Sequence, residues 1–436
     1  MCPPAERPTD APTARSAASR TEPAVDPAGE TLPQARTRIL AMFRTRRELI
    51  RWNPVSEYVN TGHVGVHELR RAAHTWGSAA LIPTTEKALD IVVKVILRAD
   101  DSNGEIQGLV GSLLQLHAEL CTAAPPRPAV LAAWLIGFRF DGTQDYFEPD
   151  IADYAHALGS PGLALLTERL DALEAELPAP TDGLDFSRDL IGRYRQRVAV
   201  AAGDSDALIA SFGELTRSYR LHDLAKSLVE VGAIDQAIAY AERAALLEDG
   251  WQAERAGHYW AELLHKHRSH GDELAARRLL FDRQPSAKNA LALAQTADAP
   301  NSSATWDSLA ETVYARLETQ HPRELITLLL GRGLTARAWE AGERLTTDVT
   351  LWTALVAANE KVDPAAVVPV LIQLIQADLA VSKPQNYKSA VARLRQLRRA
   401  LTATDDAARF PLLMAELRDE NSRRPTLIQA FDRAGF

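Results

Sequence analysis

The sequence is poor in the residues that build disulfides, metal cages and membrane spans. Its 436 residues include only two cysteines, Cys2 and Cys121, too few for a disulfide framework or a cysteine-rich zinc site. No uninterrupted apolar run approaches the ~20 residues that a membrane-spanning helix needs. No stretch alternates apolar and polar residues as a half-buried strand does. We therefore expect a protein of the reduced cytoplasm, without disulfides, membrane contact or β-sheet.

The N-terminal segment also lacks hydrophobic periodicity. It is rich in Pro, Ala, Ser and Thr and carries charges of both signs, so it cannot bury enough apolar area to offset the entropy of ordering. We predict a disordered tail over residues 1–32. Leu177-Pro-Ala-Pro-Thr-Asp-Gly contains two prolines and a glycine, which stop a helix. This motif divides the remainder into an N-terminal helical domain, 33–178, and a repeat domain, 184–436.

What the sequence does contain is helical hairpins. Residues 221–231 place apolar side chains on one helical face, Gly232 can adopt the left-handed conformation that ends a helix, and residues 234–244 form a second amphipathic stretch. The pattern returns around Gly271 and, more weakly, around Gly333. The step from Gly232 to Gly271 is longer than the usual ~34-residue period of tetratricopeptide repeats. We predict an all-α fold, an irregular α-solenoid of stacked hairpins that is tetratricopeptide-like in its C-terminal half.

Charge is distributed unevenly along the chain. The formal net charge is −8, but residues 31–75 contain eight Arg against three Glu. Residues 380–436 contain eleven Lys and Arg against six Asp and Glu. Both ends of the helical region are therefore basic, and its middle is acidic.

The basic segment near residues 36–51 is the strongest candidate for a binding surface. In a helix, its apolar side chains form a buried side and four arginines lie opposite: Arg36, Arg44, Arg47 and Arg51. Such a stripe attracts phosphates or acidic partners. We favour docking on the acidic middle of the same chain; contact with a second copy and binding of nucleic acid are the alternatives.

A second basic face lies near residues 393–399. Its arginines are Arg393, Arg395, Arg398 and Arg399. They lie opposite the apolar side of an expected helix that contains Leu394, Leu397 and Leu401. We interpret this face as a solvated helix surface, with nucleic-acid binding as the alternative.

Catalytic and metal-binding patterns are weak. Four histidines fall between His258 and His270, but His258 and His265 are two helical turns apart, roughly 10 Å, whereas zinc ligands lie about 2 Å from the ion. His63 and His67 have the spacing of a zinc-protease helix, but Val64 occupies the position of the catalytic Glu. No phosphate-binding loop or nucleophile elbow is present. We predict no catalytic residue, no metal and no cofactor.

Three segments resemble a known family. They are Arg127-Pro-Ala-Val-Leu-Ala-Ala-Trp-Leu, Asp145-Tyr-Phe-Glu-Pro-Asp and Leu413-Met-Ala-Glu-Leu-Arg, and together with the hairpin at 221–244 they resemble the helical region of bacterial SWIM zinc-finger proteins over roughly 60–436. Members of that family carry an N-terminal Cys-x-Cys…Cys-x-His zinc module thought to contact nucleic acid or protein. This chain lacks those cysteines, so the resemblance implies a fold but no zinc-dependent activity.

The functional hypothesis follows from the repeat architecture. Stacked hairpins bury most helix faces against their neighbours and leave an extended surface for a partner. We predict a non-enzymatic cytoplasmic scaffold or adaptor that binds a protein partner. Homo-oligomer formation through basic and acidic surfaces is a related hypothesis. A nucleic-acid-associated protein is the alternative, and an enzyme with an unrecognised site ranks third.

Overall fold

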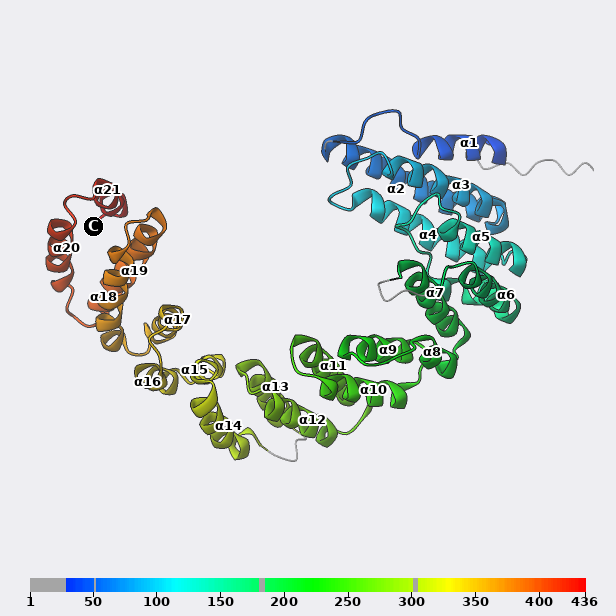
Figure 1. The fold of residues 1–436 in the computed structure, drawn as a ribbon. Coiled ribbons are helices and arrows are strands. Elements are labelled where there is room, and N and C mark those ends of the chain that lie inside the picture. The colour runs from blue at the N-terminus through cyan, green and yellow to red at the C-terminus, as the bar shows by residue number, and fades with distance from the viewer. Residues whose placement is uncertain (1–28, 51, 180–184, 301–304) are drawn as a thin grey trace, which may run out of the picture. The chain divides into compact units, whose positions relative to one another are not determined.

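The protein is helical throughout the part of the chain that the computed structural model describes, residues 29–50, 52–179, 185–300 and 305–436 (Figure 1). None of these residues lies in a β-strand, and consecutive helices pack against each other. The predicted all-α, solenoid-like fold is therefore confirmed. The contacts divide the chain into two compact units. Unit 1 comprises residues 1–214 with 227–233, and unit 2 comprises residues 215–226 with 234–436.

None of the described helices is both long enough and apolar enough to cross a membrane.

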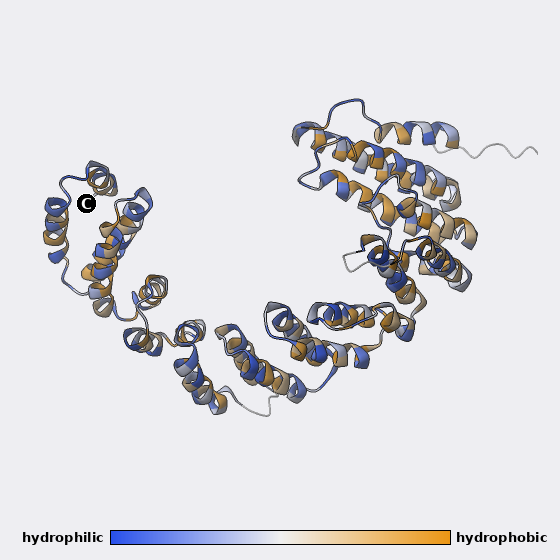
Figure 2. Ribbon diagram, viewed as in Figure 1, coloured by the Kyte–Doolittle hydropathy of each residue, from blue (hydrophilic) through white to orange (hydrophobic). Residues whose placement is uncertain are grey.

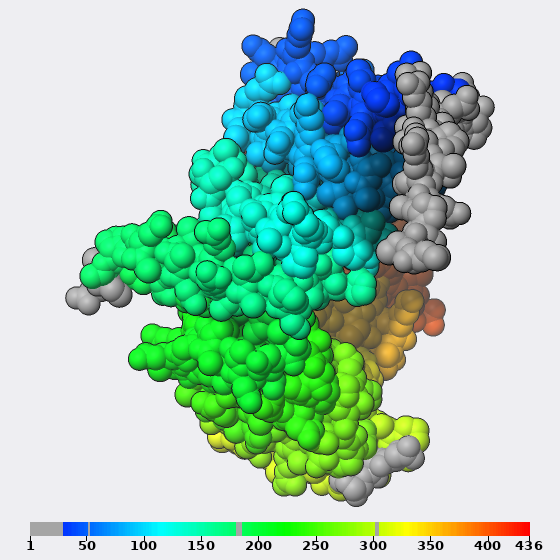
Figure 3. Space-filling view, turned by 90° about the vertical axis from the view of Figure 1, so that its right-hand side faces the viewer, coloured from blue at the N-terminus to red at the C-terminus, as the bar shows by residue number. Residues whose placement is uncertain are grey.

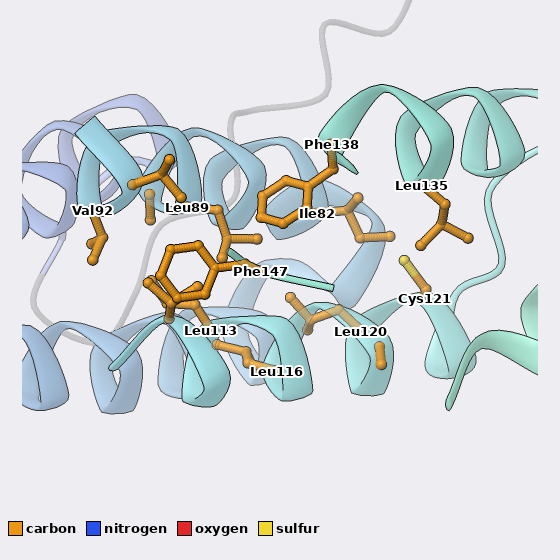
Figure 4. Packing of buried hydrophobic residues seen from close by; sticks show 14 of the residues in the cluster. Ile82, Leu89, Val92, Leu113, Leu116, Leu120, Cys121, Leu135, Phe138 and Phe147 are labelled. Atoms are coloured by element: carbon orange, nitrogen blue, oxygen red, sulfur yellow. The ribbon is translucent and has the colours of Figure 1, made fainter. Parts of the chain in front are cut away.

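Unit 1 consists of helices that are connected mostly by short loops and pack around one apolar core. Its elements are α1 (Leu32–Met42), α2 (Trp52–Trp76), α3 (Ser78–Ile96), α4 (Glu105–Ala123), α5 (Pro128–Phe140), the 3-10 helix η1 (Ile151–Tyr154), α6 (Ala155–Ala175), α7 (Phe186–Ala202) and α8 (Ser205–Ser211). In the core, Leu89 of α3, Leu113 of α4 and Phe138 of α5 are buried together (Figure 4). In the space-filling view, the helices of unit 1 from blue to cyan lie against one another without an open gap on the face shown (Figure 3).

The basic segment near 36–51 is not a single helix, so that prediction was wrong. α1 ends at Met42, and residues 44–50 are non-helical. Pro54 lies in the first turn of α2; a proline has no amide hydrogen and clashes with the carbonyl four residues earlier, which disfavours a helix that continues upstream through residue 50. The break lets both Phe43 and Leu49 be buried. The amide of Asp100 donates to the carbonyl of Leu49 at 2.8 Å and holds the segment in place.

Unit 2 is a run of helical hairpins. Its helices are α10 (Ile234–Leu247), α11 (Trp251–His267), α12 (His270–Arg283), α13 (Ala287–Ala297), α14 (Trp306–Gln320), α15 (Pro322–Gly331), α16 (Thr335–Leu345), α17 (Val349–Asn359), α18 (Pro364–Ala380), α19 (Pro384–Ala403), α20 (Arg409–Glu420) and α21 (Pro425–Ala434). The first part of α9 (Ser218–Glu230) also belongs to this unit. Polar and apolar residues occupy different sides of these helices (Figure 2).

Two of the predicted turn glycines are confirmed and one is wrong. Gly232 and Gly333 have positive φ angles of 78° and 69° and separate α9 from α10 and α15 from α16. Gly271 instead lies inside α12. The turn there is formed by Arg268 and Ser269, because the hydroxyl of Ser269 accepts from the amide of Asp272 and starts α12 as an N-cap.

Several ion pairs of unit 2 join helices of different hairpins, and four of them share one sequence separation. Four pairs link residues that are 34 positions apart: Asp249–Arg283, Glu254–Lys288, Asp282–Arg316 and Asp298–Arg332. Their N–O distances are 2.7 to 3.0 Å. Such partly exposed pairs each contribute about 0–1 kcal/mol to stability. They therefore indicate a 34-residue repeat but add little to the stability of the fold. Counting from Gly232 to Gly271 gave too long a period because Gly271 is not a turn residue.

The other predicted boundaries fall largely on residues that are not described. Of the predicted disordered tail, residues 1–28 lie outside the described residues. The same holds for residues 180–184 at the predicted domain boundary, so that boundary stays a prediction. The core of unit 1 includes Leu170 and Leu190, one on each side of it.

Candidate anion-binding pocket

Two of the four arginines in the first predicted group contact their own chain. Arg36 donates to the carbonyl of Ala80, and Arg47 pairs with Glu57 at 2.8 Å. Arg44 is exposed beside a small opening of about 210 Å³. Arg51 lies outside the described residues. The segment therefore does not present the continuous stripe that the sequence suggested.

The arginines of the second predicted group, all on α19, also differ in their contacts. Arg393 is nearly buried and pairs with Asp378 at 2.6 Å, and Arg399 pairs with Glu360 at 2.8 Å. The guanidinium of Arg398 lies over the ring of Phe410, 5.8 Å from its centroid. Arg395 is exposed on the same helix. The four arginines thus have different surroundings and do not form a shared anion-binding site.

A different group of cations does share a pocket. An opening of about 380 Å³ in unit 2 is lined by seven residues of α9, α11 and α12: His222, Lys226, Arg255, His258, Tyr259, Glu262 and Arg277. The α9 residues are one helical turn apart, and the α11 residues follow the spacing that puts side chains on one helix face. The lining has three cationic side chains against one carboxylate. It is therefore an electropositive pocket.

Two of the three cations have no counter-ion in the described part of the chain. Neither Lys226 nor Arg255 forms an ion pair there, unlike the arginines of the 34-residue register. Arg277 is held from both sides: it donates from Nη1 to Nδ1 of His258 at 3.1 Å, and its Nε lies 3.6 Å from Oε1 of Glu273. Lys226 and Arg255 line the same opening as this fixed guanidinium, and three cations in one opening suit a carboxylate or phosphate group.

His222 forms the buried wall of this pocket. Its residue surface is only 5% exposed, and neither ring nitrogen has a hydrogen-bond partner. Burial, followed by the charge of Lys226, lowers the pKa of His222 to about 4, so the ring is neutral at pH 7. An unsatisfied buried polar group costs about 1–3 kcal/mol. Both ring nitrogens are themselves shielded from solvent.

Unit 1 has a further charged opening, but its charges are already paired. Glu148, Asp150, Arg193 and Arg197 line a space of about 260 Å³. Arg197 makes a two-pronged pair with Asp150 at 2.8 Å for each bond, and Arg193 pairs with Glu148 at 3.1 Å. Asp150 also caps η1 by accepting from Ala152. These groups hold the loop onto α7.

A buried cysteine and histidine of unit 1 also lie close together without an active-site geometry. The sulfur of Cys121 is 3.8 Å from Nε2 of His117, and both residues are fully buried. Burial raises the pKa of Cys121 to about 12, so the thiol stays protonated at neutral pH and is a poor nucleophile. His117 packs against Trp134 with ring centroids 4.0 Å apart. The pair belongs to the core.

Two of the four histidines lie together beside a carboxylate. His265 and His270 lie on different helices, and both are close to the buried Glu273. The sequence argument compared only His258 with His265, which both lie on α11, and did not consider His265 together with His270. The motif Ser269-x-x-Asp272, an N-cap with an acid three residues later, predicts a helix break before His270 and was the available signal. The pocket was missed for a related reason, because its residues are one repeat apart.

Comparison with known proteins finds one family model that matches the central region of the chain. Residues 86–288 match the model of DUF6880, a family of unknown function. No curated protein matches the chain. The predicted relationship to SWIM zinc-finger proteins stays a prediction. The matched region runs from α3 to the start of α13, and it contains both the electropositive pocket and the cluster at Glu273.

Proposed function

We propose that the protein is a non-enzymatic, tetratricopeptide-like scaffold of the cytoplasm that binds an acidic segment of a partner protein. The observation that carries this proposal is the pocket in which Lys226 and Arg255, two cations without counter-ions, flank the unsatisfied ring of His222. A carboxylate placed there would pair with the two cations. The 34-residue register supports the tetratricopeptide-like part of the proposal.

Charge favours a protein partner over nucleic acid. A nucleic-acid backbone needs a track of cations that neutralises several phosphates. The pocket offers a compact cluster, with the carboxylate of Glu262 in its lining, and the predicted basic segments are largely paired with their own chain. A single acidic side chain or a short acidic segment matches this cluster better than a long polyanion does.

Affinity purification from native cells tests the proposal. We compare the wild-type chain with the double variant Lys226→Ala/Arg255→Ala, each after nuclease treatment, by mass spectrometry. The matched control is Lys266→Ala/Arg278→Ala, which removes the same charge from exposed positions of α11 and α12 outside the pocket. The proposal predicts a protein that is lost only with the pocket variant. Retention of every partner by the pocket variant contradicts it, and loss of all partners on nuclease treatment favours the nucleic-acid alternative.

A further inference from the structure

Three side chains with metal-ligating atoms converge where α11 ends and α12 begins. His265 lies in the last turn of α11, His270 is the first residue of α12, and Glu273 lies one turn further on. One ligand atom from each lies within 4.8 Å of the other two. No second group of this kind occurs among the residues that the structure describes. The cluster is separate from the electropositive pocket, whose lining contains none of the three residues.

The spacing of the ligand atoms fits a tetrahedral ion. Oε2 of Glu273 is 2.9 Å from Nδ1 of His265 and 3.7 Å from Nδ1 of His270. Zinc holds such atoms at about 2.0–2.2 Å, so two ligands of a tetrahedral zinc ion are about 3.3 Å apart. The observed distances lie on both sides of this value. Small side-chain rotations would therefore complete the site.

The surroundings orient the ligands as metal sites usually do. Nε2 of His270 is 2.8 Å from the carbonyl oxygen of Thr296; a carbonyl only accepts, so this nitrogen carries the hydrogen and Nδ1 presents its lone pair to the cluster. On Glu273, Oε1 accepts from the hydroxyl of Thr296 at 3.2 Å, which leaves Oε2 for an ion. The Glu273 side chain is only 6% exposed. Oε1 also lies 3.6 Å from Nε of Arg277, so this oxygen is paired within the chain, and Oε2 is the oxygen that faces the two imidazoles.

We propose that His265, His270 and Glu273 bind a divalent transition-metal ion of the zinc class. Two imidazoles and one carboxylate are a ligand set that zinc accepts, with water in the fourth position. The His265 side chain is 66% exposed, so the ion enters from solvent and the ring carries its hydrogen on the outward Nε2. The ion ties the last turn of α11 to the first turn of α12. It would thus fix the hairpin that also supplies Arg277 to the pocket.

Calorimetric titration of the untagged full-length chain with Zn²⁺ tests the site. The variants His265→Ala and His270→Ala each remove one ligand, and the control His267→Ala removes an exposed histidine of the same helix end. Thr296→Val leaves the ligands intact but removes the hydroxyl that orients Glu273; loss of such a supporting contact weakens metal affinity by about 10- to 100-fold. Titration with Co²⁺ reports the coordination geometry through its visible absorption.

The expected result is one Zn²⁺ bound per chain, lost in both ligand variants, weakened in Thr296→Val and unchanged in His267→Ala. The Co²⁺ complex shows the intense visible bands of tetrahedral coordination. At a concentration of zinc about 100 times its dissociation constant, the melting temperature rises by roughly 5 °C in the wild type and does not rise in His265→Ala. Equal binding by the wild type and both ligand variants, or no binding by the wild type, overturns the proposal.

Discussion

The imidazole ring of His222 lies against the phenol ring of Tyr259, with ring centroids 4.9 Å apart and planes inclined at 53°. This contact joins α9 to α11 at the wall of the electropositive pocket. It buries an imidazole that has no hydrogen-bond partner. The pocket wall therefore contains a buried polar group that makes the folded chain sensitive to acid.

Stability will fall as the medium becomes acidic. The pKa of His222 is about 4 in the folded chain against an ordinary value of 6.5. Between these two pH values the unfolded chain binds more protons than the folded chain, so the free energy of unfolding decreases as the pH falls. Once the pH is below both values, the loss from this group is about 3 kcal/mol. Urea unfolding at about pH 7 and about pH 5 measures the effect.

Two variants separate the causes of this pH dependence. His222→Phe keeps a ring against Tyr259 and removes the titrating group, so it flattens the pH dependence. Lys226→Met removes only the charge of Lys226, the second cause of the lowered pKa of His222. It therefore flattens the pH dependence of stability less than His222→Phe does. An unchanged pH dependence in His222→Phe would show that this histidine is not the responsive group.

Glycine at position 65 is required by the packing of Phe43. A Cβ atom on Gly65 would lie 2.6 Å from Cζ of the Phe43 ring, and that ring is fully buried and cannot withdraw. Gly65→Ala is expected to destabilise unit 1 by about 1–3 kcal/mol, since overpacking exceeds the gain in helix propensity. Gly108→Ala, in a helix with open space around the position, should instead stabilise by up to about 1 kcal/mol. Equal effects of the two substitutions in chemical denaturation would refute the packing argument.

The ion pair between Arg393 and Asp378 is structural. Both side chains are nearly buried, at 12% and 13% exposed, and Arg393 also donates to the carbonyl of Leu374 at 3.1 Å. Arg393→Met leaves a buried carboxylate without its partner, which costs about 3–5 kcal/mol. Arg395→Met, on the exposed side of the same helix, should change the free energy of unfolding by less than about 0.5 kcal/mol. Urea denaturation of both variants distinguishes a structural arginine from a surface one.

Cys121 should resist alkylation in the native chain. The side chain is fully buried, and its pKa of about 12 leaves almost no thiolate at pH 8. In a Cys2→Ser variant, iodoacetamide is expected to label the protein only at the rate of unfolding, and at once in denaturant. Rapid native labelling would mean that this part of the core opens readily and would reopen the case for a reactive cysteine.

The sequence predicted the elements whose signals are local. The hairpin around Gly232 forms as expected because apolar periodicity and a positive-φ glycine act within a few residues. The helix expected over 36–51 failed because Pro54, outside the segment, disfavours its continuation and because both Phe43 and Leu49 have buried positions to occupy. The amphipathic pattern of residues 36–51 alone does not show which positions are buried by tertiary contacts or that a proline follows the segment.

The candidate sites were harder to predict because they depend on which repeats become neighbours. The arginines were grouped by charge along the chain, but pairing with Glu57, Asp378 and Glu360 is decided by tertiary contacts. The pocket joins His222 to Arg255 only when the repeat register is known. The 34-residue separation of four ion pairs indicates this register. The sequence argument gave a longer period because it took Gly271, which lies inside α12, as a turn residue.

Fluorescence anisotropy of a labelled hexaglutamate peptide tests the central claim most directly. The wild-type chain is titrated at low ionic strength against this peptide, against hexaglutamine and against a single-stranded oligonucleotide. The account predicts binding of the glutamate peptide that weakens with salt, no binding of the glutamine peptide, and an affinity at least about tenfold lower in Lys226→Ala/Arg255→Ala, about 1.4 kcal/mol, with Lys266→Ala/Arg278→Ala unaffected. Equal affinity of the two double variants, or tighter binding of the oligonucleotide with no effect of the pocket variant, would contradict it.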